Sequence, residues 1–372
     1  MSSTDALDFA SEILTGEVQA ADPLGADRVL ATAPRLNAGA DVNGLVAAMR
    51  AIAPDLATID RMTIADTLAA LRDLGLIMGS IRRHGPEPLE LAPELTPALL
   101  ALGRRTDMVP RDTILHYTVW NPPGVRQRMY TDDDQEGHLQ ESVRMVWPDL
   151  HAALADLDWL SGLDVHDPDF APRLDAVADR LQPTVASMTL VARHVTPEFF
   201  AFGLRPYLEA ARVDGVDYFG PAAAQLPIWL VDKALWATDH TDEEYEPFLL
   251  GLVPYSLPRW RRLHERLTGR PSIAGRLVAT LGADPQEATR RSPALRAGAE
   301  AAVRALRVLV TFRGRHLGIA RRVYDLDDTY TEGSGGGSVD LLRQILDLTK
   351  ENARRSRPSP VVPAPREEIR PA

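Results

Sequence analysis

Two side chains at helical spacing within an apolar segment could hold a metal cofactor. Arg313 and His316 lie in the segment Val308–Leu317, and their i, i+3 spacing puts them on one face of a helix. An imidazole that projects from a buried helix can take an axial position on haem iron. A guanidinium group one turn away could pair with a haem propionate. The spacing alone leaves a second interpretation open, in which both side chains lie on a solvated helix face.

A glycine-rich segment follows this helix. Gly333–Ser338 contains three consecutive glycines between Ser334 and Ser338. Glycine allows backbone conformations that other residues avoid, so the chain can approach a ligand closely there. The segment is not a Walker loop, because no lysine follows it, and not a dinucleotide-binding turn, because no strand precedes it. Its position after the His316 helix favours a lid or substrate clamp, with a flexible connector as the alternative.

Other candidate side chains have a structural interpretation beside the functional one. Arg205 precedes a proline, which can distort a helix, and its guanidinium suits bidentate carboxylate binding. Phe200 could contact an aromatic substrate or belong to the core. Ser142 and Tyr324 could be a polar helix residue and a packing residue. The pair Asp232–Lys233 is interpreted as ordinary charge on a helix surface.

The composition limits the remaining chemistry. The 372 residues include no cysteine, which excludes disulfides, thiolate metal sites, iron–sulfur clusters and cysteine nucleophiles. Lys+Arg total 41 against 52 Asp+Glu, a net charge of −11, which argues against non-specific binding of nucleic acid. No apolar run approaches the roughly 20 residues of a membrane helix, and the N-terminus lacks a signal-peptide pattern. We therefore expect a cytoplasmic protein with no membrane partner.

Helical periodicity dominates the chain, and strand signals are weak throughout. A helix is predicted over 63–83, where Thr63 and Asp66 form a potential capping box. The segment Thr113–Trp120 could be a short strand or a buried helical turn. Further helices are predicted from Asp133 to Pro148 and over 168–190, 197–213, 222–238, 242–268, 286–324 and 338–355. The pattern predicts an all-α protein with a Pro-rich disordered tail.

Several of these segments together resemble a known group of haem enzymes. Phe312-Arg-x-x-His316, then Gly333-Ser-Gly-Gly, then a helix ending at Leu348-Thr349, are similar to the indoleamine 2,3-dioxygenase superfamily. The resemblance implies that His316 is the proximal metal ligand of haem b and that Arg313 meets a propionate. It also implies that the loop with Ser334, Gly335 and Gly336 closes over the amino-acid end of the substrate.

Two more segments fit the same superfamily. Val195–Arg205 resembles the segment in which an aromatic ring contacts the indole and an arginine binds the substrate carboxylate, which implies these roles for Phe200 and Arg205. Gly137–Ser142 resembles the segment that places a serine above the iron on the distal face, which implies that role for Ser142.

The chain resembles the monodechloroaminopyrrolnitrin synthase family more closely. The similarity runs from Asp22 to Thr349 in ordered blocks, which include Arg72–Gly75, Gly79–Pro88, His116–Pro122 and Ala320–Tyr324. It implies that Tyr324 and Ser334 line the substrate side of the haem. Departures at Gly337 and at Gly314-Arg315 leave the substrate open, and His84 and His116 receive no role.

The resemblance implies a helical dioxygenase-like fold with a smaller N-terminal helical region at 1–125, a larger haem-binding domain at 126–352 and a tail at 353–372. It also implies a haem-dependent oxidative enzyme of antibiotic biosynthesis. The substrate would be tryptophan or a chlorinated tryptophan, and dioxygen or peroxide the oxidant. The expected reaction is indole-ring oxidation with rearrangement to a phenylpyrrole-type product.

Two alternative functions stay open. One is a haem-dependent tryptophan 2,3-dioxygenase or aromatic amino-acid hydroxylase. The other is a non-enzymatic helical protein that binds haem, indole or another protein. The sequence leaves the electron donor and the oligomeric state undetermined.

Overall fold

The computed structural model describes residues 11–240, 243–326 and 332–358. Over these residues the chain is almost entirely helical. Its two short strands, β1 (Ala211–Val213) and β2 (Val216–Tyr218), form an antiparallel hairpin in which Val213 lies opposite Val216. The predicted all-α fold class is therefore confirmed.

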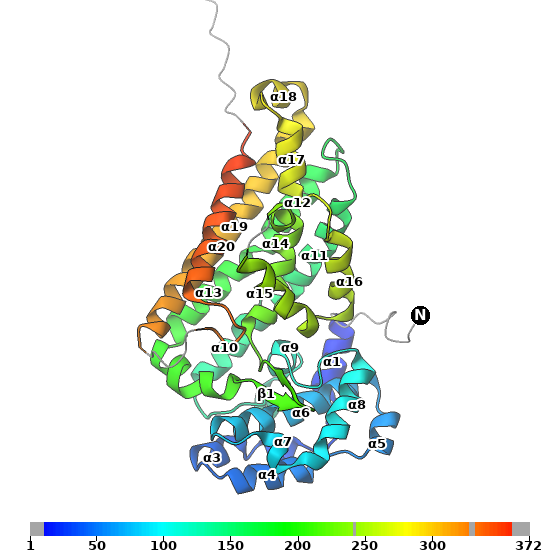
Figure 1. Cartoon of the computed structure of the whole chain (residues 1–372), viewed down its shortest axis with the longest axis vertical. Coiled ribbons are helices and arrows are strands. Elements are labelled where there is room, and N and C mark those ends of the chain that lie inside the picture. Colours follow the sequence, from blue (N-terminus) through cyan, green and yellow to red (C-terminus); the bar gives the residue numbers. More distant parts are fainter. Residues whose placement is uncertain (1–10, 241–242, 327–331, 359–372) are drawn as a thin grey trace, which may run out of the picture.

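The N-terminal part places short helices around one long helix (Figure 1). Helix α6 (Ile64–Arg83) is buried along most of its length and begins at the predicted capping box. Asp66 N donates to Thr63 Oγ1, and Thr63 N donates to Asp66 Oδ2, both at 3.1 Å. Its neighbours are α1 (Glu12–Ala20), α4 (Val42–Ala51) and α8 (Thr96–Thr106). The other elements here are α2 (Asp27–Leu30), α3 (Ala33–Ala38), α5 (Leu56–Arg61), α7 (Pro88–Leu91), η2 (Pro93–Leu95), α9 (Ile114–Tyr117) and η3 (Gly124–Arg126).

The second part contains the longer helices. Helix α19 (Pro293–Tyr324) has 32 residues and packs against α12 (Phe170–Arg180), α13 (Gln182–His194) and α20 (Val339–Arg355), with α19 and α20 side by side in Figure 1. The remaining elements are α10 (Asp134–Arg144), α11 (Trp147–Ser161), η4 (Phe199–Leu204), η5 (Arg205–Leu208), η6 (Ala223–Gln225), α14 (Ile228–Leu235), η7 (Ala237–Asp239), α15 (Tyr245–Leu252), η8 (Val253–Tyr255), α16 (Pro258–Leu267), α17 (Ile273–Leu281) and α18 (Pro285–Arg291).

Several predicted helices are divided where capping residues and prolines interrupt them. The helix predicted over 286–324 is two helices, because Ser292 caps α19 through a hydrogen bond from Leu295 N (3.2 Å) and Pro293 opens its first turn. The segment 242–268 divides into α15, η8 and α16, and 168–190 into α12 and α13. The segment Thr113–Trp120, for which two structures were open, contains the short helix α9.

The prediction of one helix over 197–213 is wrong. The chain forms the π-helix η4, then the 3₁₀-helix η5 and then the β1–β2 hairpin. Pro206 is the second residue of η5 and has no N–H to continue an α-helical ladder. Asp214 and Gly215 take positive φ values of 51° and 78° at the hairpin turn, which ends the helical conformation.

Some predictions about the whole chain are only partly addressed by the described residues. Helix α20 continues to Arg355, three residues into the segment predicted as a tail; the tail from 359 onward and the N-terminal residues 1–10 lie outside the described residues. The boundary at 125/126 stays a prediction. Within the described residues no helix is long and apolar enough to cross a membrane.

Candidate functional site

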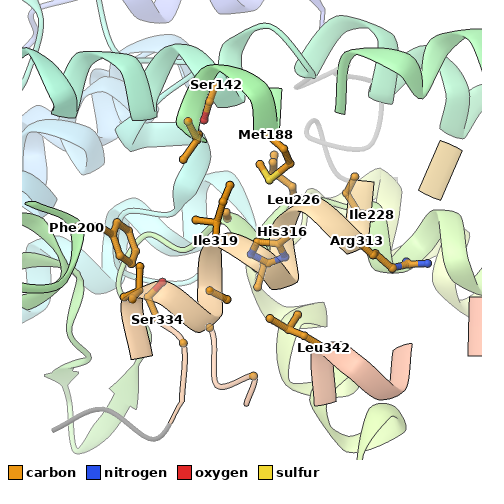
Figure 2. A pocket seen from close by; sticks show the side chains of 18 of the residues that line it. Ser142, Met188, Phe200, Leu226, Ile228, Arg313, His316, Ile319, Ser334 and Leu342 are labelled. Carbon is orange, nitrogen blue, oxygen red and sulfur yellow. The ribbon is translucent and has the colours of Figure 1, made fainter. Parts of the chain in front are cut away.

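A cavity of about 340 Å³ lies among α10, α13, η4, α14, α15, α19 and the glycine-rich loop (Figure 2). Most of its wall is apolar, with Val143, Val146, Met188, Leu226 and Ile319 as examples. Concave apolar cavities with a few polar groups are typical of sites for small molecules and cofactors. Eight of the nine predicted site residues line it: Ser142, Phe200, Arg205, Arg313, His316, Tyr324, Ser334 and Gly335.

His316 presents a neutral imidazole to this cavity. Among the described residues, neither ring nitrogen has a hydrogen-bond partner, and the ring stacks on Phe312 with centroids 6.0 Å apart. Burial and, to a smaller extent, the nearby Arg313 charge together lower the pKa of His316 from its usual 6.5 to about 4. At neutral pH the ring therefore keeps a free lone pair, which is the form that binds a metal.

Arg313 has protein partners on both terminal nitrogens. Its Nη2 ion-pairs with Asp232 of α14, and its Nη1 donates to Thr349 Oγ1 of α20. The side chain is 7% exposed, and Figure 2 shows it running away from the imidazole of His316. Arg313 thus lines the cavity, but both terminal nitrogens of its guanidinium already bind protein side chains. Its pairing with a propionate stays a prediction.

The interpretation of Asp232 as surface charge is wrong. Asp232 is 2% exposed and accepts hydrogen bonds from Trp236 Nε1 (3.0 Å) and Tyr245 Oη (2.8 Å) besides the Arg313 contact. Its neighbour Lys233 instead reaches Thr268 Oγ1 at 2.8 Å. A usable signal was present in the sequence, because Asp232 interrupts an apolar helix and has a tryptophan four residues later.

A second cluster of polar side chains lies at the C-terminal end of α19. Arg205 begins η5 immediately after the π-helix and donates from Nη2 to the Glu332 carbonyl at 3.4 Å. Burial raises the pKa of Tyr324, while the Arg205 charge lowers it and the Glu332 charge raises it. Tyr324 is therefore protonated at neutral pH and can donate a hydrogen bond. Sequence reasoning did not single out Glu332, which lines the same end of the cavity.

Phe200 and Ser142 approach the cavity from different elements (Figure 2). Phe200 lies in η4, and π-helical turns are often found at functional sites, where they redirect side chains. Ser142 lies on α10, is 5% exposed and donates from Oγ to the Leu139 carbonyl at 2.7 Å. Its oxygen can still accept a hydrogen bond from the cavity.

The glycine-rich loop forms a compact turn at the cavity wall. Gly333 N donates to the Gly337 carbonyl (2.8 Å), and Gly336 N donates to the Gly333 carbonyl (2.9 Å). Gly336 has a φ of +84°, which favours glycine, and it shapes the turn without lining the cavity. A Cβ at Gly337 would lie 3.2 Å from the Phe248 ring. Ser338 caps α20 by accepting from Leu341 N at 3.0 Å.

The two histidines without a predicted role lie away from the cavity. His116 is fully buried, and its Nδ1 accepts from Thr113 N at 3.1 Å, which closes the first turn of α9. His84 is the C-cap residue of α6. Neither residue lines the cavity.

The chain matches a protein family over most of its length. The family described as monodechloroaminopyrrolnitrin synthase PrnB matches residues 43–360. The match includes every element that lines the cavity, from α10 to α20. Members of this family share a helical fold like that of the indoleamine and tryptophan dioxygenases, in agreement with the predicted fold.

Proposed function

The chain belongs to the monodechloroaminopyrrolnitrin synthase family, a family of tryptophan-modifying enzymes of pyrrolnitrin biosynthesis. From this premise we propose that it oxidises tryptophan or a chlorinated tryptophan, with haem b bound by His316. The observation that carries the proposal is the neutral imidazole that faces an apolar cavity and has no hydrogen-bond partner among the described residues.

The residues around His316 fit a porphyrin. The neutral imidazole of His316 would bind the haem iron, and the apolar cavity walls would suit a porphyrin. Because the sequence has no cysteine, a thiolate ligand is excluded. Arg313 lies one helical turn from His316, and a propionate would have to share or replace its contacts with Asp232 and Thr349. The bound haem would supply the oxidation, with dioxygen or peroxide as oxidant.

The protein's own groups would bind and orient the substrate. We assign the substrate carboxylate to Arg205, whose guanidinium offers two parallel donors, and the indole ring to Phe200. Ser334 and Gly335 would cover the amino-acid end, and Gly336 would shape the turn that holds them there. Holding the reacting ring in one orientation converts a bimolecular encounter into an effectively unimolecular step.

The hydroxyl groups of Ser142 and Tyr324 would donate and accept hydrogen bonds to the substrate. Tyr324 is protonated at neutral pH and lies beside Arg205, so it can donate to a substrate oxygen or nitrogen. Ser142 can accept a hydrogen bond while it donates to the Leu139 carbonyl. The expected outcome is oxidation and rearrangement of the indole ring to a phenylpyrrole-type product.

A haemin titration of the full chain tests the cofactor assignment. The wild-type protein should bind haemin stoichiometrically and give a sharp Soret band. His316→Ala should lose the band or shift it strongly, and added imidazole should restore part of it. His166→Ala, which removes an exposed histidine outside the cavity, is the control. A wild-type spectrum in His316→Ala would exclude His316 as the ligand.

Product masses distinguish the reactions. The reconstituted protein is incubated with tryptophan, 7-chlorotryptophan and tyrosine, with dioxygen and a reductant or with peroxide. A product that has lost carbon dioxide and rearranged supports the proposal. Tryptophan carrying two added oxygen atoms would identify a dioxygenase, hydroxytyrosine would identify a hydroxylase, and no turnover of any substrate would favour a binding protein.

A further inference from the structure

We infer that the packing of Gly79 and Tyr130 against Tyr207 fixes the position of η5 and thereby directs Arg205 toward the substrate carboxylate. The three residues are positioning residues, which act through η5, because none of them lines the cavity. The inference rests on the proposed function, in which Arg205 binds the carboxylate of an amino-acid substrate. It assigns part of the substrate selectivity to contacts with α6, a helix outside the cavity wall.

The short helix η5 contacts the cavity through one side and α6 through another. Arg205 lines the cavity, whereas Tyr207 is 6% exposed and does not. Residues two apart in a 3₁₀-helix point in different directions, and the hydrogen bonds of such a helix have poorer geometry than those of an α-helix. Pro206 also has no N–H to contribute. The position of Arg205 therefore depends on what packs against η5, and α6 is one of its neighbours.

Gly79 allows the backbones of α6 and η5 to approach each other closely. A Cβ at residue 79 would lie 2.8 Å from the Tyr207 carbonyl oxygen and 2.5 Å from Tyr130 Oη. Both distances are below those that real Cβ atoms show, so another residue at position 79 would force its neighbours to move. Because the Tyr207 atom belongs to the backbone, no rotation of a side chain relieves that overlap.

Tyr130 supplies the second surface against which Tyr207 packs. The two rings stack with centroids 4.7 Å apart and planes 19° apart, and Tyr130 is fully buried. Its backbone is fixed on both sides, because Tyr130 N donates to Glu136 Oε1 and Asn37 Nδ2 donates to the Tyr130 carbonyl, each at 2.8 Å. The Tyr130 hydroxyl has no hydrogen-bond partner among the described residues. The ring therefore acts on Tyr207 through stacking.

The C-terminal end of α6 also binds the chain that follows η5. Arg82 Nε donates to the Ala210 carbonyl at 3.1 Å, and Arg82 Nη2 lies 3.4 Å from Glu209 Oε2. Because residues 209 and 210 are attached to α6, a displacement of Tyr207 would be taken up on its other side, at Pro206 and Arg205. A small shift at Gly79 would thus reach the guanidinium that is proposed to bind the substrate.

A purely structural role for Gly79 predicts a different result. If the glycine only avoids crowding in the core, its replacement should lower the free energy of unfolding and weaken the binding of all ligands alike or of none. If it positions Arg205, its replacement should weaken the binding of tryptophan much more than that of tryptamine, which lacks the carboxylate. The ratio of the two affinities therefore separates the two roles.

The experiment measures tryptophan and tryptamine binding to the haem-reconstituted full chain by isothermal titration calorimetry. In Gly79→Ala the ratio of the tryptamine Kd to the tryptophan Kd should fall roughly tenfold, because a misplaced guanidinium loses most of its charged hydrogen bonds to the carboxylate. Tyr207→Leu, which removes the stacked ring, should lower the ratio in the same direction. Tyr207→Phe, which keeps the ring, should retain the wild-type ratio.

The matched control is Gly103→Ala in α8, which also packs against α6. A Cβ at residue 103 would lie 3.0 Å from both the Met108 carbonyl oxygen and Pro110 Cα, and none of these residues lines the cavity. This variant should lower the free energy of unfolding, measured by denaturant titration, and keep the wild-type affinity ratio.

An unchanged ratio in Gly79→Ala, or an equal fall in Gly103→Ala, would overturn the inference. If Gly79→Ala does not fold, the Tyr207 pair decides: a lower ratio in Tyr207→Leu with a wild-type ratio in Tyr207→Phe supports the inference, and any other pattern overturns it. A wild-type ratio in Arg205→Ala would instead refute the carboxylate assignment in the proposed function.

Discussion

The backbone of Gly335 lies against Ala224 so closely that a Cβ at residue 335 would be 2.6 Å from the Ala224 Cβ. This distance is well below van der Waals contact. Any residue other than glycine at position 335 would therefore force the loop or Ala224 to move. The contact joins the glycine-rich loop to η6, and both segments line the cavity. Close packing against Ala224 therefore fixes the position of the loop, in addition to the hydrogen bonds within the loop.

Gly335→Ala should displace the loop from η6 and weaken the binding of an amino-acid substrate. Overpacking of this kind costs roughly 1–3 kcal/mol, and here the cost should appear in substrate affinity, because the loop contributes little to the core. Tryptophan binding measured by its perturbation of the haem spectrum checks the first effect, and thermal unfolding checks the second.

The control for this substitution is Gly251→Ala on α15, where a Cβ meets nothing within 4 Å. That change should leave tryptophan affinity unaltered and raise stability by up to about 1 kcal/mol, because alanine favours a helix. Wild-type tryptophan affinity in Gly335→Ala would show that the seating of the loop does not matter for binding.

Arg205→Ala should weaken tryptophan binding by about 2 kcal/mol or more, through the loss of charged hydrogen bonds to the carboxylate. The same variant should bind tryptamine, which lacks the carboxylate, as well as the wild-type protein does. Titrations with both ligands measure the difference. The ratio of the two affinities separates carboxylate recognition from a general disturbance of η5.

Arg322→Ala is the matched control for Arg205, because Arg322 also lines the cavity but is exposed on α19. It should retain discrimination between tryptophan and tryptamine. Equal losses for both ligands in Arg205→Ala would contradict the assigned role of Arg205.

The free energy of unfolding should fall on acidification partly because of His116. Burial lowers the pKa of His116 from 6.5 to about 3, with a smaller contribution from the Arg72 charge. Between these values the unfolded chain binds a proton that the folded chain excludes. The stabilising contribution of His116 is therefore complete above pH 6.5 and is lost progressively as the pH falls toward 3.

His116→Asn should remove this contribution while it keeps an acceptor for Thr113 N. The slope of unfolding free energy against pH, measured by denaturant titration between about pH 4 and 6, should decrease by about 1.4 kcal/mol per pH unit. The pKa of Asp112 is raised by burial to about 6, which gives an opposing slope in the same range. A comparison of the two proteins cancels that term, and an unchanged slope would show that His116 does not titrate as a buried neutral ring.

Local features of the fold were readable in the sequence because neighbouring residues create them. The capping box at Thr63 and Asp66 involves residues three apart, and both of its hydrogen bonds are present. The segment 197–213 was read wrongly because its apolar pattern suits a helix. In the folded chain η4 packs against α19, η5 against α6, and β1 against α6 and α7, all of which are distant in sequence.

The sequence by itself determined the all-α class, the absence of cysteine chemistry and the face of α19 that carries Arg313 and His316, because spacing along one helix defines a face. Only the tertiary structure decided what surrounds that face. It brought Ser142, Phe200, Arg205 and the glycine-rich loop to one cavity with His316. It also turned Asp232 inward to meet Arg313 and left His316 without a described hydrogen-bond partner. Burial and pairing depend on which helices pack together, and no local pattern encodes that choice.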